Sequence, residues 1–476
     1  MNQAPHAVRP LTPSLAHKGR ENLKLHGQQG GRMKKSVSRM LALCLLLSFG
    51  WARLASADAV TDWNANAGKA AVAVCIAPMQ DPLHEARLYA MMHLAIHDAL
   101  NAIDRRSRPY TFDSQAPAGA SVDATVATAA HDVLIPLLQQ IPAPFPPECI
   151  AAGVASVEAD YTAALAAIPD GVAKTQGVDL GHAAAVAILA LRANDGSDTP
   201  LIDSTYPQGT NPGEYRFTPG FPFFFGPGWA DVTPFVLRDS SQFRPGPPYK
   251  LTSKKYTADF NEVKSLGGDG VTTPSARTAD QTQLALFWVE SSPLGWNRIA
   301  RIVATAEGLD PWENARLFGL LNMALTDGYM GGFEAKIHHN FWRPVTAIQL
   351  ADIDGNADTK ADPTWTPLAP TPPVPDHPST HSVEGGAAAQ VLKRFFKEDQ
   401  ISFSTCSLTM PLVAEQCGGA AEVLRSFSSF THAADENGLS RVLVGFHFRH
   451  AVNAGIKHGR KIGNRAVNLF LKPVKK

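Results

Sequence analysis

Three short segments in the C-terminal third carry side chains that could bind and activate a tetrahedral oxyanion. Lys336 and Arg343 lie seven residues apart, and Arg343 precedes a proline. The second segment reads Pro378-Ser379-Thr380-His381, and the third joins Ser440-Arg441 to His447. A guanidinium matches two oxygens of such an anion, an ammonium adds a compact charge, and an imidazole can transfer protons or act as a nucleophile. This inventory suits phosphate or an ion of the same shape, such as vanadate.

Each segment alone also has an ordinary structural explanation. On a helix, Lys336 and Arg343 would share a face within about 20°, and such pairs usually form a solvated basic face. Ser379 could simply cap a helix next to an incidental His381, and His447 lies among apolar residues, where a histidine is usually part of the core. The ordinary explanations do not account for all three segments together, because three cations gathered in a partly apolar region are costly to bury without a counter-anion.

The elements that must position these residues can be predicted locally. We expect the helix that carries Lys336 to end at Arg343, because proline disfavours helical conformation in the residue before it. Ser379 and its neighbours should precede a helix over 382–396, whose first N–H groups attract anions. Arg441 and His447 would point about 120° apart on one helix. We therefore expect Arg441 on a capping turn before a last helix over 442–471.

The sequence as a whole has the residue pattern of a helical protein. Apolar or alanine-rich residues recur at helical spacing over 84–103, 119–140, 151–168, 176–193, 276–290, 296–307 and 311–333. Two stretches rich in proline and glycine, 200–250 and 363–378, should form long irregular loops. We predict a mostly α fold: one domain over 58–476, a large helical bundle with the active site in its core and the motifs within 336–447.

Residues 1–57 have the character of a leader and signal peptide. Lys34, Lys35 and Arg39 precede the apolar run 41–49, and Ala55-Ser56-Ala57 fits a cleavage site. The composition of 1–32 favours Met33 as the true start. We expect cleavage near Ala57 and a periplasmic or secreted mature chain, with an uncleaved anchor as the alternative. No later stretch approaches ~18 uninterrupted apolar residues, so we expect no stable membrane span in the mature chain.

Net charge and cysteine content further narrow the class of protein and the compartment in which it could work. Residues 1–57 hold nine of the 43 Lys and Arg but one of the 43 acidic residues, so the remainder carries a net charge near −8. A mildly acidic body argues against a nucleic-acid partner. Four cysteines follow residue 57, which allows two disulfides in an oxidising compartment, or four free thiols. Cys406 and Cys417 close a short loop and are the natural pair, which leaves Cys75 with Cys149.

The order Lys336-x6-Arg343-Pro344, Pro378-Ser379-x-His381 and Ser440-Arg441-x5-His447 resembles the signature of the type 2 phosphatidic-acid phosphatase and vanadium haloperoxidase superfamily. The surrounding segments 315–318, 341–348 and 445–449 resemble its bacterial vanadium-dependent haloperoxidase branch. The resemblance implies an α-helical fold and a vanadate cofactor, with phosphate able to occupy the same site. The implied partners are hydrogen peroxide, a halide and a small organic acceptor, which the hypohalous product would halogenate.

The resemblance also implies a role for each site residue. Lys336, Arg343 and Arg441 would bind the vanadate oxygens, and Ser379 with the backbone N–H of Thr380 would complete the pocket. His447 would be the axial ligand of vanadium, and His381 the acid–base group.

Two positions depart from the family pattern. Thr380 stands where the family usually has glycine, so its side chain could crowd the anion. Ala451 stands where many members have an aspartate that orients the imidazole, and Glu290 or Asp435 could supply the missing carboxylate. An exported acid phosphatase with His447 as nucleophile and His381 as general acid remains an alternative, as does a non-catalytic oxyanion-binding protein. The sequence sets neither the halide or phosphoester nor the oligomeric state, and a homo-oligomer is compatible with it.

Overall fold

A computed structural model describes residues 58–410 and 423–474, and most of these residues are helical. The predicted mostly α fold is therefore confirmed. The described helices lie in one compact unit, Ala55–Lys476. The predicted leader over 1–57 lies outside the described residues. Cys417, one member of the predicted pair Cys406–Cys417, also lies outside them.

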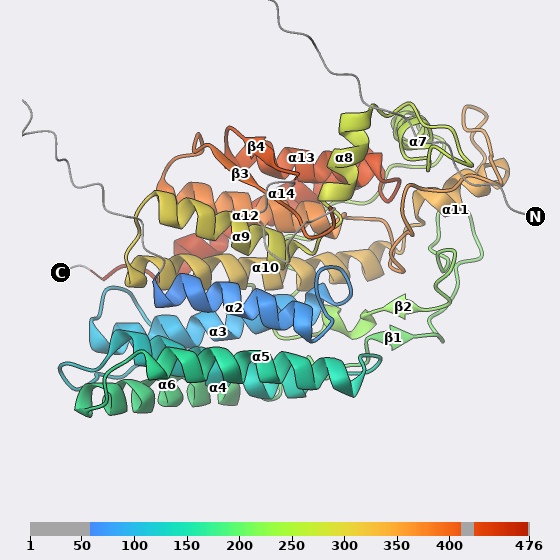
Figure 1. Ribbon diagram of the computed structural model, residues 1–476. Helices are drawn as coiled ribbons and strands as arrows, with labels where there is room; N and C mark the ends of the chain where they lie inside the picture. The colour runs from blue at the N-terminus through green and yellow to red at the C-terminus, as the bar shows by residue number, and fades with distance from the viewer. Residues whose placement is uncertain (1–57, 411–422, 475–476) are drawn as a thin grey trace, which may run out of the picture. The chain divides into compact units, whose positions relative to one another are not determined.

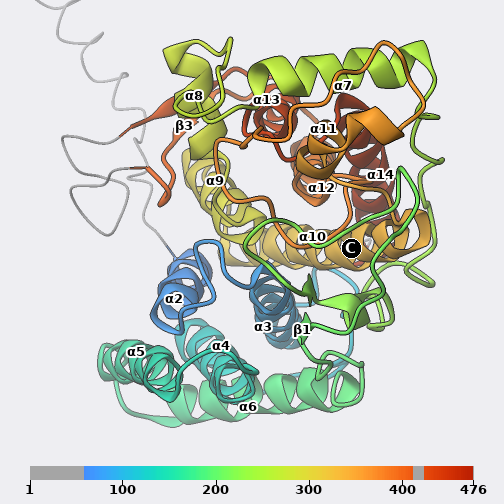
Figure 2. The ribbon, with the colours of Figure 1, turned by 90° about the vertical axis from the view of Figure 1, so that its right-hand side faces the viewer.

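The helices form two groups on either side of one long central helix, α10 (Figures 1 and 2). The N-terminal group comprises α2 (Ala59–Ala73), α3 (Pro82–Ile103), α4 (Val122–Gln139), α5 (Pro147–Ala166) and α6 (Val172–Leu191). The C-terminal half comprises α7 (Lys254–Leu266), α8 (Ala279–Phe287), α9 (Ser292–Ala306), α10 (Pro311–His339), α11 (Pro344–Gln349), α12 (Thr380–Phe396), α13 (Phe430–Leu443) and α14 (Arg449–Leu469). Helix α10 packs against α3 on one side and α12 on the other.

Strands contribute little to the described fold. The pair β1 (Ile202–Asp203) and β2 (Phe224–Phe225) is antiparallel, as is the pair β3 (Phe403–Thr405) and β4 (Arg425–Phe427). Two short 3₁₀ helices, η1 (Pro227–Ala230) and η2 (Ala351–Ile353), lie in the loops.

Local sequence signals explain where the central helix begins and ends. Asp310 caps α10 by accepting the Glu313 N–H, and the Glu313 side chain accepts the Asp310 N–H in return. Pro311 occupies the first helical position, where its missing N–H costs nothing. Asn340 ends the helix in the left-handed conformation, with φ of 44°. The helix therefore stops at His339, four residues before the predicted end at Arg343.

A stripe of glycines brings α14 against α12 at very close range. A Cβ on Gly459 would lie 1.9 Å from the carbonyl oxygen of Val383, and one on Gly455 would lie 2.5 Å from that of Ser379. Gly463 continues the stripe, 2.6 Å from the oxygen of Ala387 by the same measure. The spacing of four places these glycines on one face of α14. This contact fixes the first turns of α12, which carry Ser379 and His381.

The long loops gather at the end of the bundle where α10 finishes (Figure 2). The segments 200–250 and 350–378 run beside each other there: Thr218 donates to the carbonyl of Thr371 at 2.9 Å, and the N–H of Phe225 donates to that of Pro373 at 3.0 Å. The predicted irregular loops are thus present, although α7 begins soon after the first one. The second loop leads directly into the Ser379 motif.

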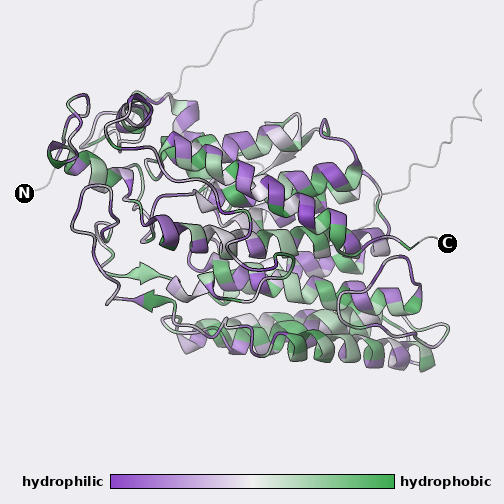
Figure 3. Ribbon diagram, turned by 180° about the vertical axis from the view of Figure 1, so that it is seen from behind, coloured by the Kyte–Doolittle hydropathy of each residue, from purple (hydrophilic) through white to green (hydrophobic). Residues whose placement is uncertain are grey.

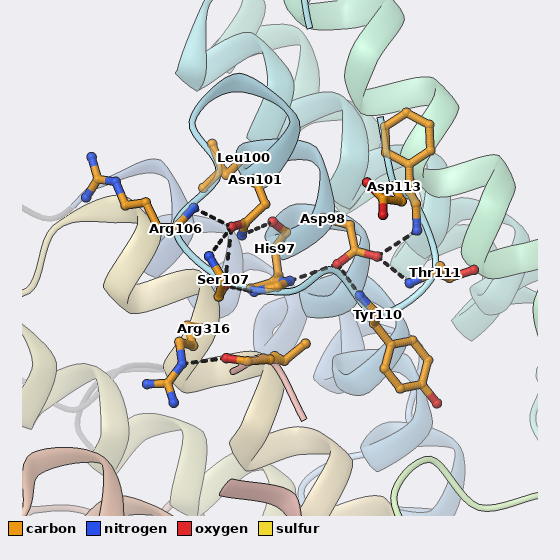
Figure 4. Close-up of polar contacts among 12 residues, drawn as sticks. His97, Asp98, Leu100, Asn101, Arg106, Ser107, Tyr110, Thr111, Asp113 and Arg316 are labelled. Carbon is orange, nitrogen blue, oxygen red and sulfur yellow. Dashed lines mark hydrogen bonds and ion pairs between the residues drawn. The ribbon is translucent and has the colours of Figure 1, made fainter. Parts of the chain in front are cut away.

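A buried polar cluster on α3 fastens the loop after that helix (Figure 4). Asp98 accepts the backbone N–H groups of Tyr110, Thr111 and Phe112 at 2.7–2.9 Å. His97 bonds Asp98 at 2.8 Å through Nδ1 and the Ser107 hydroxyl at 2.7 Å through Nε2. The hydrogen-bonded series Ser107–His97–Asp98 resembles a catalytic triad. Because all three side chains are buried and Asp98 is saturated by backbone donors, we assign this cluster a structural role.

The outer helices of the N-terminal group are rich in apolar residues (Figure 3). Among the described residues, α5 has a length and composition that would suffice to cross a membrane. It packs against α2 and α4 as part of the bundle, and a disulfide between Cys75 and Cys149 joins its first turn to the second residue after the end of α2. Length and composition alone are weak evidence of a membrane span, because a bundle helix can have both.

Candidate oxyanion site

Lys336 and Arg343 reach the same short segment from two different elements. Lys336 lies in the last turn of α10, and its Nζ donates to the carbonyls of Pro375 and Asp376 at 2.6 and 3.1 Å. Arg343 has extended backbone (φ −80°, ψ 156°) just before α11, and its Nε donates to the carbonyl of Val374 at 2.6 Å. Both side chains are fully buried. They converge because the chain turns at Asn340, so the prediction that they share one helix face is wrong.

The Ser379 motif begins a helix, as predicted. Ser379 occupies the N-cap position of α12, and Thr380 and His381 lie in its first turn. The Ser379 hydroxyl accepts a hydrogen bond from Ser382 at 3.0 Å and is buried, whereas Thr380 and His381 are partly exposed. His381 contacts the carbonyl of Glu290 through Nε2 at 3.2 Å. The free N–H groups of this turn are available to an anion.

Arg441 and His447 are separated by a break in the chain. Arg441 lies in the last turn of α13, and α14 starts only at Arg449. The break occurs at Gly445, whose φ of 86° favours glycine. The N–H groups of Phe446 and His447 both donate to the carbonyl of Arg441, so the chain folds back on it. The predicted single helix over 442–471, with Arg441 on its capping turn, is therefore wrong.

His447 is held by partners on both ring nitrogens. Its Nδ1 lies 2.8 Å from Oδ1 of Asp376, and its Nε2 lies 2.8 Å from a terminal nitrogen of Arg343. Hydrogen bonding of Nδ1–H to the carboxylate leaves the lone pair on Nε2. That lone pair is what a ligand or nucleophile role requires, and it faces a cation that would also attract an anion.

Asp376 is the carboxylate that sequence analysis missed. Neither expected candidate reaches His447: Glu290 pairs with Arg298 at 2.7 Å, and the exposed Asp435 lies 3.7 Å from Arg460. Asp376 lies just before the Pro378 motif but is 71 residues from His447. The sequence feature that could have identified Asp376 was its position in the loop just before the Pro378 motif.

The side chain of Thr380 packs against the central helix. Its Cγ2 lies 2.8 Å from where a Cβ on Gly332 of α10 would be, so the glycine makes room for it. Thr380 is not among the described residues with positive φ. The backbone of Thr380 therefore does not require glycine. Its methyl group packs against Gly332, away from the N–H groups of the first turn of α12. At Ala451, the backbone oxygen accepts the Ser379 N–H at 3.1 Å.

The cluster carries an excess of buried positive charge. Burial lowers the pKa of Lys336 well below its usual value, that of Arg343 to about 10 and that of Arg441 to about 9. Burial also lowers the pKa values of His447 and His381, and the neighbouring arginines add to both shifts. Burial raises the pKa of Asp376 to about 7, although Arg343 and Lys336 oppose the shift. The one carboxyl group, Asp376, lies near Arg343 and Lys336, and Arg441 adds a third cation near Arg343. A multiply charged tetrahedral oxyanion therefore fits this donor set.

The helical fold is that of the vanadium haloperoxidases. A solved structure described as the first bacterial vanadium-dependent iodoperoxidase matches with a TM-score of 0.70 and 24% identity, covering 88% of this chain and 98% of that one. A holo-type bacterial vanadium-dependent chloroperoxidase matches with a TM-score of 0.64 and 18% identity, covering 85% and 94%.

The sequence comparisons agree with the fold. The family model described as the VCPO second helical-bundle domain matches residues 316–476, which contain all three motifs. The vanadium chloroperoxidase of Curvularia inaequalis is 25% identical over 292 residues, or 48% of this chain and 47% of that protein. The match thus spans about half the length of this relative. The resemblance to the vanadium haloperoxidases that the motifs predict is confirmed.

Proposed function

We propose that this protein is a vanadium-dependent haloperoxidase that uses hydrogen peroxide to oxidise a halide to a hypohalous species. The observation that carries the proposal is the setting of His447. Its Nδ1 contacts Asp376 while its Nε2 faces Arg343 within a group of buried cations. An imidazole fixed in this way beside an oxyanion pocket suits a ligand of vanadate.

The residues of the pocket would contact the anion in different ways. Lys336, Arg343 and Arg441 would hold its oxygens and offset its charge. Ser379 and the first N–H groups of α12 would donate further hydrogen bonds. Vanadate, when bound through His447, supplies a Lewis-acidic centre that activates peroxide toward the halide. Asp376 keeps the His447 ring in the orientation and tautomer that expose Nε2.

His381 is the acid–base group of this proposal. Burial, with Arg441 nearby, lowers its pKa well below its usual value, so the ring is neutral at neutral pH. A neutral imidazole can accept a proton from hydrogen peroxide and return it to the leaving oxygen. The partial exposure of His381 leaves it accessible to peroxide, the halide and a small organic acceptor.

Paired assays on the full chain test the proposal. The protein loaded with orthovanadate should oxidise bromide or iodide with hydrogen peroxide, phosphate should inhibit, and His447→Ala should abolish the activity. Absence of turnover with every halide at saturating vanadate would contradict it. In that case, hydrolysis of a phosphomonoester that depends on His447 would identify the acid phosphatase instead. Anion binding without either activity would identify a non-catalytic homologue.

A further inference from the structure

The acid–base histidine of the proposed function is held by the backbone of a short turn between α8 and α9. Nε2 of His381 lies 3.2 Å from the carbonyl oxygen of Glu290. Two residues earlier, the carbonyl of Trp288 accepts a hydrogen bond from Nη2 of Arg441 at 2.6 Å. The turn over 288–291 thus orients one imidazole and one cation of the anion pocket through its backbone carbonyls.

The contact with Glu290 determines which nitrogen of His381 carries the proton. A carbonyl oxygen can only accept a hydrogen bond, so Nε2 must be the donor. Burial lowers the pKa of His381 well below its usual value, and Arg441 adds to the shift, so the neutral ring has its lone pair on Nδ1. Within the described residues, Nδ1 has no hydrogen-bond partner, and it is not among the fully buried unpaired atoms. Nδ1 is therefore the nitrogen that is free to take a proton from a bound molecule.

The side chain of Glu290 anchors the turn to the helix that follows it. Its two oxygens accept hydrogen bonds from the two terminal nitrogens of Arg298 at 2.7 and 2.9 Å, which makes a two-point ion pair. One of these oxygens also accepts the backbone N–H of Leu408 at 2.8 Å, and Arg298 donates to the carbonyl of Cys406 at 2.7 Å. Both charged side chains are buried. The carboxylate thus fixes the position of the Glu290 backbone.

The stability of the fold does not by itself explain an ion pair buried at this place. The cost of removing both charges from water offsets much of their attraction, so apolar residues of similar volume are often as stabilising. The surroundings are nevertheless fitted to the pair. A Cβ on Gly295 would lie 3.1 Å from Oε2 of Glu290, and the next N–H of the turn, that of Ser291, donates to the carbonyl of Pro78 at 2.6 Å. The position of the Glu290 carbonyl gives the pair a role that stability alone does not.

We propose that the Glu290–Arg298 ion pair is a positioning device for His381, which makes Nδ1 of this histidine the proton acceptor of the reaction. The inference rests on the proposed function, in which hydrogen peroxide, a halide ion and a proton give a hypohalous acid and water. Hydrogen peroxide transfers a proton to Nδ1, the imidazolium returns it to the oxygen that leaves as water, and solvent supplies the additional proton. Nε2 keeps its proton and its bond to the carbonyl throughout. Glu290 and Arg298 are positioning residues that do not touch the substrate.

Nitrogen NMR of the full chain with isotope-labelled histidine rings tests the tautomer directly. At neutral pH the signals of His381 should show a protonated Nε2 and an unprotonated Nδ1, and His381→Gln identifies these signals by their loss. The opposite tautomer, or a charged ring at neutral pH, overturns the inference. The measurement needs no turnover, so it decides the tautomer even if the protein oxidises no halide and the proposed function fails.

Glu290→Gln tests the ion pair in the vanadate-loaded full chain. The amide keeps the size of the side chain but removes its charge. We therefore expect kcat/KM for hydrogen peroxide to fall about tenfold, and the His381 signals to move toward the average of two exchanging tautomers. Asp195→Asn is the matched control, because this buried carboxylate also pairs with arginine, Arg87 and Arg192 at 2.9 Å each, but contacts no site residue. Unchanged kcat/KM and signals in Glu290→Gln, or an equal loss in the control, overturns the inference.

Two further measurements separate positioning of His381 from a general disturbance of the fold. The affinity of Glu290→Gln for phosphate, measured by calorimetry, should fall less than kcat/KM because the pocket cations remain, and an equal fall overturns the specific role. If Glu290→Gln does not fold, Arg298→Lys carries the kinetic test. Lysine keeps the charge but cannot hold both carboxylate oxygens in a fork, so kcat/KM should again fall, and an unchanged value overturns the inference.

Discussion

At the scale of single residues, the site depends on a few side chains whose partners lie far away in the chain. His447 and Asp376 meet across 71 residues, and Arg343 contacts His447 across 104. Residue type and order singled out the cations and imidazoles that the structure brings together. They were not enough to predict Asp376, because a search along the helix from His447 assumes that this histidine is helical. In the structure it lies in the break between α13 and α14.

Asp376→Asn tests the orientation of His447. We expect turnover of the vanadate-loaded protein to fall about 10- to 100-fold, because the carboxylate no longer fixes the Nδ1–H tautomer. Phosphate affinity should not fall, because removing a negative charge favours an anion. Asp435→Asn, at an exposed position paired with Arg460, is the control and should behave as wild type. Unchanged turnover in Asp376→Asn would show that the imidazole is oriented by other groups.

Glu85 should make the stability of the protein depend on pH. Burial raises its pKa from 4.5 to about 8, so the folded state keeps a proton that the unfolded state has lost. The free energy of unfolding should therefore fall as pH rises from about 4.5 to about 8, by up to roughly 5 kcal/mol. Urea denaturation near pH 5 and pH 8 measures this. Glu85→Gln should reduce the dependence, whereas the exposed Glu307→Gln should not; equal slopes in wild type and Glu85→Gln would refute the assignment.

At the scale of elements, hydrophobic periodicity predicted most helices, whereas breaks and contacts between helices were harder. The predicted helix over 442–471 begins only at Arg449, as α14, because the chain breaks at Gly445, which takes a left-handed conformation. The helix through Lys336 ends early, at Asn340. Glycine and asparagine are visible in the sequence, but whether they break a helix depends on tertiary contacts. The glycine stripe of α14 has a regular spacing of four, yet its partner α12 is not apparent from the sequence.

Gly459→Ala should disrupt the packing of α14 against α12. The added Cβ would meet the Val383 carbonyl at 1.9 Å, and neither backbone can move freely. We expect the free energy of unfolding to fall by about 2–3 kcal/mol, with weaker phosphate binding because α12 positions Ser379 and His381. Chemical denaturation and calorimetry measure the two effects. Gly246→Ala, where a Cβ would meet nothing within 4 Å, should change stability by less than about 0.5 kcal/mol. Equal stability of both variants would contradict the close contact.

At the scale of the whole molecule, the N-terminal helices support a site that they do not form. The pocket residues come from α10 to α14 and the loops between them, whereas the Cys75–Cys149 disulfide secures α2 to α5. We propose that the protein is exported, as the leader-like residues 1–57 predict. The disulfide supports this, because such bonds persist mainly in oxidising compartments.

Replacing both Cys75 and Cys149 with serine should destabilise the protein without affecting the pocket. The bond closes a segment with a sequence separation of 74, and its loss should lower the free energy of unfolding by about 2–4 kcal/mol. Scanning calorimetry with and without reductant measures the loss, and phosphate titration at low temperature should give the wild-type affinity. Thermal stability insensitive to both reductant and substitution would show that the bond does not form in the protein.

The central claim is that Lys336, Arg343, Arg441, Ser379 and His447 form one oxyanion pocket. Calorimetric titration of the full chain with orthovanadate tests it most directly. We predict one equivalent bound per chain, competition by phosphate, and at least tenfold weaker binding in both Arg343→Met and His447→Ala. Binding that neither substitution weakens, or no binding of either anion, would contradict the account.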